Sequence, residues 1–197
     1  MKKHSQNVET AKKVHIQTFG CQMNEYDTEK MLEVLKHENY SQTNCQDEAD
    51  LIILNTCSIR EKAENKVYSE LGRLRELKAT NPDLKIGVGG CVAQQEGKAI
   101  LRRAKNVDFV FGTDNLFELP EMLSKVAEGQ KISRTERHAR QKVRNFIPDY
   151  TFQQAKNFGV KAQIAITKGC NNHCSFCVVP FTRGVEVSRE PEHIIAE

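Results

Sequence analysis

The chain has 197 residues, of which 39% are hydrophobic and 28% charged, with a formal net charge of +3. This length allows one large domain, or one domain and part of another, with enough apolar residues for a packed core. No apolar run approaches the roughly 18 residues that cross a bilayer, and no apolar stretch follows the charged N-terminus. These features argue against a membrane anchor or signal peptide and predict a cytoplasmic protein, in which seven cysteines favour metal sites over disulfides.

Apolar runs alternate with helical patterns along the first two thirds of the chain. Strands are expected at residues 13–19, in LIILNT before Cys57, in KIGVGG before Cys91 and in NVDFVFG. Helices are expected after each of them, the later ones near 94–104 and 115–128. Strands that alternate with helices in this way predict an α/β domain with a parallel sheet over residues 13–130.

Local signals mark the helix ends. Asn24 is expected to cap the first helix, and Ser58 with Glu61 forms a capping-box pattern at the start of the second. The residue pair Asn81–Pro82 is expected to end that second helix, because proline disfavours the α conformation in the preceding residue. The second helix also carries an apolar stripe at helical spacing that is expected to pack on the sheet: Val67, Leu71, Leu74 and Leu77.

The last third of the chain has a different organisation. Residues 131–156 lack clean periodicity and are expected to be a linker; its basic run, 131–144, is either a phosphate contact or a solvated segment. A new strand is expected at 160–167, followed by a cysteine loop and a helix that begins in REPEHIIAE. One strand, one loop and one helix cannot bury a core, so residues 157–197 are expected to begin a larger βα domain. The chain is therefore predicted to be a fragment.

Cys170, Cys174 and Cys177 form the C-x3-C-x2-C pattern GCNNHCSFC. Three thiolates on a short loop can hold three irons of a [4Fe–4S] cluster, which leaves the fourth iron open for a substrate or cofactor. A zinc site with His173 as fourth ligand is the alternative, although structural zinc sites usually have two separated knuckles. The spacing favours iron–sulfur.

Three more cysteines each follow an expected strand: Cys21, Cys57 and Cys91. The carboxyl ends of parallel strands line the crevice where ligands bind, so these thiols are expected to converge at one edge of the sheet. They indicate a second metal cluster; the alternative is three small buried cysteines. Cys45 lies in the polar stretch SQTNCQDEAD with no strand before it, and is expected not to be a ligand.

Several segments resemble, in order, the radical S-adenosylmethionine methylthiotransferase family: TFGCQMNEYDTEKM, NTCSIREKAENKVYSELGRL, GVGGCVAQQEG and VVPFTRGVEVSR. The resemblance extends from residue 14 to the end. It implies an N-terminal methylthiotransferase domain followed by the start of a partial βα barrel. It is strongest to the branch of the family that modifies tRNA.

The resemblance also implies two [4Fe–4S] clusters. Cys170, Cys174 and Cys177 match the ligands of the cluster that binds S-adenosylmethionine and generates a 5′-deoxyadenosyl radical. Phe176, before the last of these cysteines, is expected to contact the adenine of that cofactor. The other three strand-end cysteines match an auxiliary cluster that holds the sulfur to be inserted. An electron donor such as flavodoxin or ferredoxin is implied, and no further catalytic residue is assigned.

The implied reaction adds a 2-methylthio group to N(6)-isopentenyladenosine at position 37 of tRNA, near the anticodon, by a monomeric enzyme. The alternatives are methylthiolation of a ribosomal-protein aspartate, methylthiolation of threonylcarbamoyl-adenosine in tRNA, and an inactive iron–sulfur-binding fragment. The chain by itself is expected not to turn over, because radical chemistry needs an enclosing cavity and only the first βα unit of that enclosure is expected here.

Overall fold

The computed structural model describes residues 11–58, 61–138 and 163–197. Its centre is a six-stranded sheet in the order β2-β1-β3-β4-β5-β6, in which every neighbouring pair is parallel. The strands are β1 (Lys12–Thr18), β2 (Tyr40–Gln42), β3 (Leu51–Thr56), β4 (Lys85–Gly90), β5 (Phe109–Phe111) and β6 (Ile132–Arg134). The prediction of an α/β fold with a parallel sheet is confirmed.

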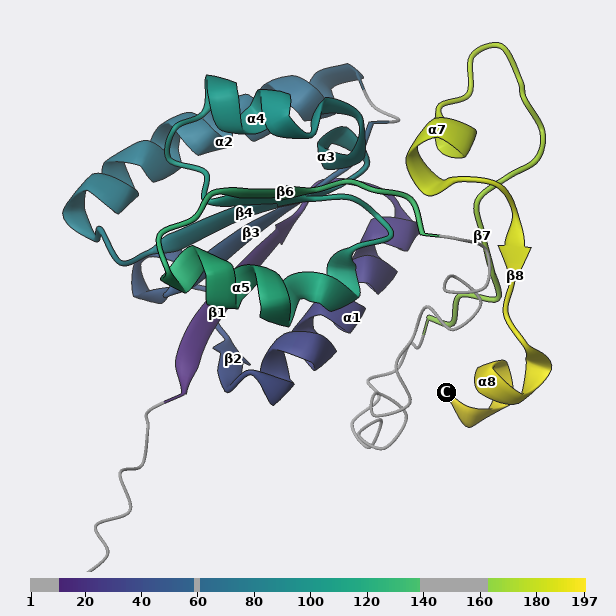
Figure 1. Cartoon of the computed structure of the whole chain (residues 1–197), viewed down its shortest axis with the longest axis horizontal. Coiled ribbons are helices and arrows are strands. Elements are labelled where there is room, and N and C mark those ends of the chain that lie inside the picture. Colours follow the sequence, from purple (N-terminus) through teal and green to yellow (C-terminus); the bar gives the residue numbers. More distant parts are fainter. Residues whose placement is uncertain (1–10, 59–60, 139–162) are drawn as a thin grey trace, which may run out of the picture.

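Helices cover both faces of this sheet (Figure 1). The helices are α1 (Gln22–His37), α2 (Glu61–Thr80), α3 (Cys91–Glu96), α4 (Lys98–Arg103) and α5 (Leu119–Ala127), with 3-10 turns η1 (Gln46–Glu48) and η2 (Leu116–Glu118). Leu51 and Ile53 of β3 pack with α1 and α5, whereas Ile52 and Leu54 pack with α2 and α4. All six residues of β3 are buried, as expected for a central strand that is covered on both faces.

Several details of the helices were predicted correctly. Val67, Leu71 and Leu74 of α2 are almost fully buried in the core cluster against β3 and β4, and Leu77 packs at its margin. Helix α2 ends at Thr80, before the proline.

The prediction of one helix over 94–104 is wrong. Gly97 separates α3 from α4 and has a φ of 49°, a left-handed conformation that glycine adopts easily and that interrupts a helix.

Asn24 is not the cap of α1. Cys21 occupies the N-cap position, and Asn24 lies within the first turn with 0% exposure. Its side chain forms buried hydrogen bonds to β3, so tertiary contacts decide its role. The capping box falls partly outside the described residues, since nothing is described of the Glu61 side chain. The Ser58 hydroxyl oxygen is buried without a hydrogen-bond partner in the part of the chain that the structure describes.

The prediction that a linker begins at residue 131 is wrong, because residues 132–134 form a strand. Strand β6 pairs with β5 through Phe109 and Ile132, Val110 and Ser133, and Phe111 and Arg134. β6 has three residues, and only Ile132 is buried. A strand of this length is too short to show a periodic pattern in the sequence. Residues 135–138 have no regular structure, as expected of a linker, and 139–156 lie outside the described residues.

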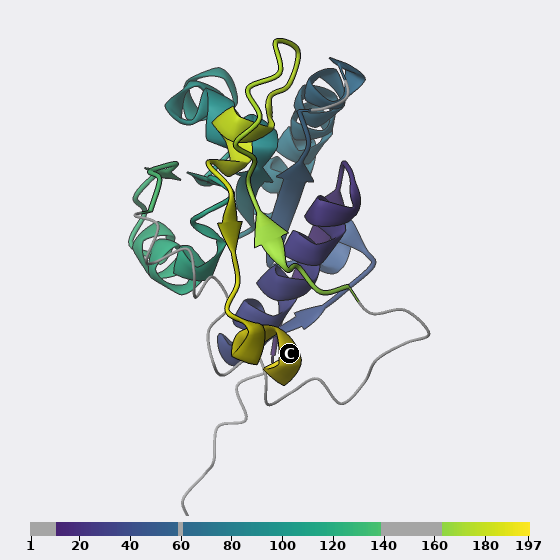
Figure 2. The same cartoon turned by 90° about the vertical axis from the view of Figure 1, so that its right-hand side faces the viewer.

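Residues 163–197 form a C-terminal segment that lies beyond the carboxyl ends of the strands (Figures 1 and 2). It contains β7 (Thr167–Lys168), α7 (Val179–Arg183), β8 (Val187–Ser188) and α8 (Pro191–Ala196). The helix expected in REPEHIIAE is confirmed. The strand expected at 160–167 is wrong for residues 163–166, which have no regular structure, and 160–162 are outside the described residues. β7 instead pairs antiparallel with β8, through Thr167 and Ser188.

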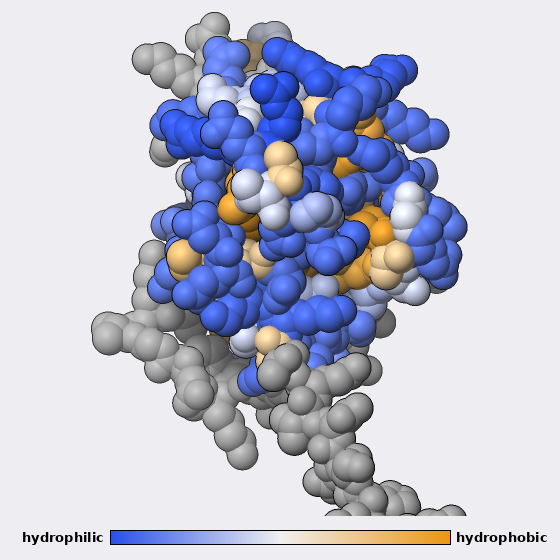
Figure 3. All heavy atoms as spheres, turned by 90° about the vertical axis from the view of Figure 1, so that its left-hand side faces the viewer, coloured by the Kyte–Doolittle hydropathy of each residue, from blue (hydrophilic) through white to orange (hydrophobic). Residues whose placement is uncertain are grey.

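The surface of the sheet domain is mainly polar. Figure 3 shows the side opposite the C-terminal segment as largely hydrophilic, with small separate apolar spots. The large apolar side chains that are exposed in the described residues belong to the C-terminal segment: Ile164, Ile166, Phe176, Phe181, Val185 and Ile195. None of the described helices is long and apolar enough to cross a membrane.

Candidate metal centre at the carboxyl ends of the strands

The structure places Cys21, Cys57 and Cys91 at the carboxyl ends of three adjacent strands. Cys57 directly follows β3, Cys91 directly follows β4, and Cys21 begins α1 shortly after β1. The strand ends are aligned, because Thr18 pairs with Asn55 in β1–β3 and Thr56 pairs with Gly90 in β3–β4. This is the arrangement that the alternation of strands and helices predicts.

The three cysteines at the strand ends are less exposed to solvent than Cys45. Cys57 and Cys91 are buried, and Cys21 is partly exposed. Cys45 is exposed and precedes η1 and β3, on the amino side of the sheet. No disulfide links any of the seven cysteines.

Two glycines allow the strand ends to approach one another closely. A Cβ atom on Gly20 would lie 2.8 Å from the Cβ of Cys57 and 2.6 Å from Oδ1 of Asn24. A Cβ atom on Gly90 would lie 2.3 Å from the carbonyl oxygen of Thr56, and Gly90 has a φ of 90°. Any larger side chain at either position would therefore displace the backbone that carries a cysteine.

Two buried asparagines join α1 to β3 beneath the cysteines. Nδ2 of Asn24 donates to Oδ1 of Asn55 at 3.0 Å and to the carbonyl oxygen of Thr56 at 2.9 Å. Nδ2 of Asn55 donates in return to the carbonyl oxygen of Asn24 at 2.8 Å. The thiol of Cys21 donates to Oδ1 of Asn24 at 3.3 Å. This network fixes the position of Cys21 relative to Cys57.

Thr56 connects the end of β3 to the helix that Cys91 begins. Its hydroxyl donates to the carbonyl oxygen of Gly89 at 2.6 Å and accepts from the backbone N–H groups of Val92 at 3.2 Å and Ala93 at 3.3 Å. A hydroxyl has one donor and two acceptor sites, so this one is fully used. Thr56 thus caps α3 from a neighbouring strand and holds Cys91 in place.

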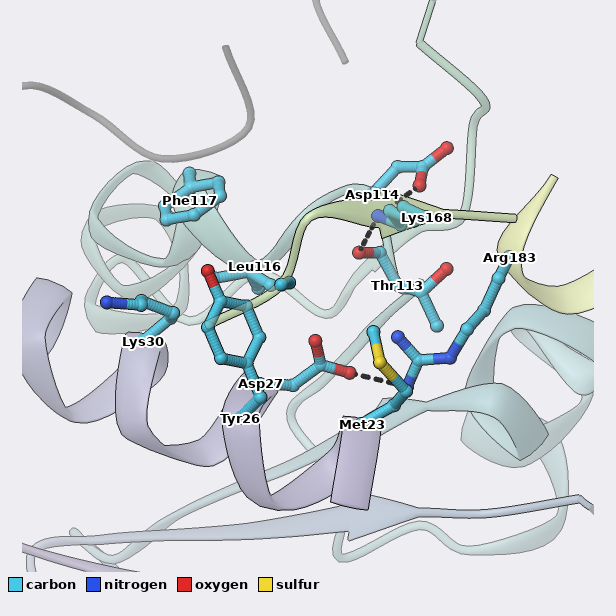
Figure 4. Close-up of a pocket in the computed structure, with 11 residues that line it drawn as sticks. Met23, Tyr26, Asp27, Lys30, Thr113, Asp114, Leu116, Phe117, Lys168 and Arg183 are labelled. Carbon is cyan, nitrogen blue, oxygen red and sulfur yellow. Dashed lines mark hydrogen bonds and ion pairs between the residues drawn. The ribbon is translucent and has the colours of Figure 1, made fainter. Parts of the chain in front are cut away.

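Arg183 brings the C-terminal segment to the same edge. Its Nη2 lies 2.6 Å from Oδ2 of Asp27 on α1, and both side chains are at least 90% buried (Figure 4). The pKa of Arg183 lies above its ordinary value: burial alone would lower it, but the charge and hydrogen bond of Asp27 raise it. Its second terminal nitrogen, Nη1, is buried and has no hydrogen-bond partner among the described residues. A buried donor of this kind fits an anionic group beside Cys21 and Cys91.

Further buried contacts hold the C-terminal segment against α1 and the β5–η2 loop. Nζ of Lys168 lies 2.6 Å from Oδ1 of Asp114 and donates to the carbonyl oxygen of Thr113 at 2.7 Å. The hydroxyl of Thr113 donates to the carbonyl oxygen of Thr182 at 2.6 Å. These contacts fix the backbone next to Arg183.

The carboxylate of Glu197 forms a second group of contacts with α1. It lies 2.7 Å from Nζ of Lys30 and accepts a hydrogen bond from the Tyr26 hydroxyl at 3.4 Å. Burial, together with the charge of Glu197, raises the pKa of Tyr26.

The cavity between α1 and the C-terminal segment is too small for a cofactor. It has a volume of about 20 Å³, which is room for about one water molecule. Asp27, Lys30, Asp114, Lys168 and Arg183 line it together with apolar side chains (Figure 4). These charged groups therefore serve to join the segment to the sheet domain rather than to bind a nucleotide.

Cys170, Cys174 and Cys177 lie in the loop between β7 and α7. The backbone N–H of Cys170 donates to the carbonyl oxygen of Gly184 at 3.0 Å, and that of Cys177 donates to the carbonyl oxygen of Cys174 at 3.0 Å. Cys174 is exposed, and the other two are partly exposed. Phe176 is 92% exposed, so its ring is accessible to a ligand.

Neither triplet forms a site for a single metal ion. Within the residues that the structure describes, no three His, Cys, Asp or Glu side chains are arranged to hold one ion. A [4Fe–4S] cluster is less restrictive, because each thiolate binds a different iron and the sulfurs need not converge on one point. Thiols on three aligned strand ends, together with a buried donor of Arg183 that has no partner among the described residues, fit such a cluster.

The described part of the basic run is largely engaged within the protein. Nη2 of Arg134 lies 2.7 Å from Oε1 of Glu121, and Nη1 of Arg137 lies 3.7 Å from Oδ2 of Asp114. These ion pairs weaken the case for phosphate contact by residues 131–138. Residues 139–144 are outside the described part.

Sequence reasoning did not find Asn55, Thr56, Asp27 and Arg183 as parts of this site. The signal for the first two was present, since they are the only polar residues in the otherwise apolar run LIILNT. Asp27 and Arg183 are 156 positions apart, and no local pattern connects them.

Comparison with known proteins finds relatives over nearly the whole chain. A protein from Janthinobacterium sp. (strain Marseille) named tRNA-2-methylthio-N(6)-dimethylallyladenosine synthase is 52% identical over 94% of this chain. A protein of the same name from Shewanella oneidensis is 48% identical over 95%. The chain spans only 41% and 39% of the lengths of these two curated relatives. Residues 13–112, just over half of the chain, match the family described as "Uncharacterized protein family UPF0004", and the chain belongs to this family.

Proposed function

We propose that this chain is the N-terminal part of a tRNA methylthiotransferase and that Cys21, Cys57 and Cys91 bind a [4Fe–4S] cluster. The observation that carries the proposal is the position of these cysteines at three adjacent strand ends, together with the buried Nη1 of Arg183 on a helix that packs against the helix that Cys91 begins. Cysteines that only fill an apolar core would not need a buried, positively charged hydrogen-bond donor nearby. When bound, the cluster would hold the sulfur atom that the reaction transfers.

Cys170, Cys174 and Cys177 are proposed to bind the second [4Fe–4S] cluster, which supplies radical chemistry from S-adenosylmethionine. The exposed ring of Phe176 is available to stack on the adenine of that cofactor. The protein's own residues anchor this loop: Gly184 accepts a backbone hydrogen bond from Cys170, and Arg183 and Lys168 fix its two flanks to the sheet domain. The division into a sheet domain and a radical S-adenosylmethionine region that begins near residue 157 belongs to this proposal.

The substrate proposed for the whole protein is N(6)-isopentenyladenosine at position 37 of tRNA, which would receive a 2-methylthio group. The names of the relatives support tRNA as the substrate. The reaction would take place in the cytoplasm, with flavodoxin or ferredoxin as electron donor and with the protein as a monomer.

Metal analysis tests the two sites. After anaerobic reconstitution, the chain should hold about eight irons and eight sulfides if both clusters form. Replacing Cys170, Cys174 and Cys177 with alanine should leave about half, and so should replacing Cys21, Cys57 and Cys91. Cys45→Ala is the matched control and should lose no iron. A loss in Cys45→Ala as large as that in Cys57→Ala would contradict the assignment.

Complementation tests the substrate. A host without its own enzyme would receive the gene that encodes the whole protein, and its tRNA nucleosides and ribosomal proteins would be analysed by mass spectrometry. A 2-methylthio group on isopentenyladenosine is expected. A methylthio-aspartate in a ribosomal protein, or a methylthiolated threonylcarbamoyl-adenosine, with isopentenyladenosine unchanged would refute the proposal. Purified chain 1–197 is expected to give no product with S-adenosylmethionine, reductant and tRNA.

A further inference from the structure

Arg183 reaches from the C-terminal segment to α1, the helix that Cys21 caps. It ends α7, which begins two residues after Cys177, and α7 packs against α3, the helix that Cys91 begins. One arginine therefore ends the helix that follows the second triplet, and that helix packs against the helix that Cys91 of the first triplet begins.

The side chain of Arg183 is held firmly and has one donor to spare. Its Nη2 is occupied by Asp27 at 2.6 Å, and the side chain of Arg183 is 6% exposed. Its Nη1 is buried and lacks a hydrogen-bond partner among the described residues. A buried donor of a charged group is unfavourable when it is left unsatisfied, so such donors in native proteins usually face an acceptor.

The groups around Arg183 indicate which acceptor this is. Asp27 on α1, the helix that Cys21 caps, lies on the Nη2 side, and α7 packs against α3, the helix that Cys91 begins. Lys168, another buried cation of this interface, is engaged by Asp114 and Thr113. An anionic sulfur atom beside Cys21 and Cys91 would satisfy Nη1.

We propose that Nη1 of Arg183 donates a hydrogen bond to a sulfur atom of the cluster bound by Cys21, Cys57 and Cys91, and thereby raises its reduction potential. This inference rests on the proposed function. Hydrogen bonds to the sulfurs and nearby charge set the potential of an iron–sulfur cluster. A cation stabilises the more negative, reduced form. Arg183 would thus connect the segment that carries the second cysteine triplet to the cluster that the first triplet binds.

The test uses the full chain with Cys170, Cys174 and Cys177 replaced by alanine, so that only the first cluster remains. Midpoint potentials would be measured by redox titration followed by electron paramagnetic resonance. Arg183→Met would leave the carboxylate of Asp27 buried without a partner, so this substitution is combined with Asp27→Asn and compared with Asp27→Asn alone. The double variant should show a lower potential than Asp27→Asn.

Two further variants keep the test decisive. Arg183→Lys retains the charge and the pairing with Asp27 but removes the Nη1 donor. It should therefore lower the reduction potential by less than the double variant does. If the double variant holds no iron, an unchanged potential in Arg183→Lys overturns the inference. Lys168→Met breaks another buried ion pair of the same interface and should leave the potential unchanged.

The possible failures are distinguishable. If the parent with alanines at 170, 174 and 177 binds no iron, the proposed function falls and the inference falls with it. If the parent binds its cluster and the potentials of Asp27→Asn and Asp27→Asn/Arg183→Met are equal, only the inference is overturned. An equal shift in Lys168→Met would assign the effect to loosening of the segment and would also overturn it.

Discussion

Replacing Thr56 with valine should destabilise the protein far more than its small change in shape suggests. The Thr56 hydroxyl donates to the carbonyl oxygen of Gly89 and accepts from the N–H groups of Val92 and Ala93. Valine keeps the branched shape and removes all three hydrogen bonds. The residue has 0% exposure, so water cannot replace the hydroxyl without rearrangement.

The magnitude follows from the groups left without partners. Loss of a helix cap costs about 1–2 kcal/mol, and the carbonyl of Gly89 loses a bond worth about 1 kcal/mol. The free energy of unfolding should therefore fall by about 2–3 kcal/mol. With a urea dependence of roughly 2 kcal/mol per molar, the unfolding midpoint should fall by about 1 M.

Urea unfolding followed by circular dichroism measures this change, with Thr56→Ser as the matched control. Serine keeps the hydroxyl and removes one methyl group, which should cost about 0.8 kcal/mol. If Thr56→Val and Thr56→Ser differ by less than about 0.5 kcal/mol, which is an ordinary surface effect, the hydroxyl does not cap α3 as described.

Two further predictions concern backbone geometry and an exposed ion pair. Gly90→Ala should destabilise the protein by more than about 1 kcal/mol in thermal or urea unfolding, because its φ is 90° and the new Cβ would meet the carbonyl of Thr56 at 2.3 Å. Gly72→Ala, in the exposed middle of α2 with no atom within 4 Å of the added Cβ, should instead stabilise it by about 0.5–1 kcal/mol; equal effects of the two changes would refute this reasoning. The hydrogen bond and charge of Lys13 lower the pKa of Glu48, so the stabilisation from this carboxylate is present above its ordinary pKa and is lost as the pH falls through the lowered one. Lys13→Met should raise the Glu48 midpoint in an NMR titration, and an unchanged midpoint would contradict the pairing.

The spacing of residues along the chain was enough to predict the sheet and the position of the first cysteine triplet. In a parallel sheet, a residue directly after a strand lies at the carboxyl edge whatever the later packing, so Cys57 and Cys91 had to lie near each other. The apolar stripe of α2 likewise had only one way to be buried. Both inferences depend on local periodicity, which the sequence displays directly.

Tertiary structure decided what local patterns cannot encode. Asparagine is a residue type that often caps helices, but the hydrogen bonds of Asn24 to β3 make it part of the buried network. Strand β6 has three residues and exists because β5 offers an open edge. Arg183 meets Asp27 across 156 positions, and Thr56 caps a helix that begins 35 residues later, because folding brings the strand ends together. The sequence by itself therefore predicted which cysteines bind a cluster, whereas only the folded chain determined which side chains surround those cysteines.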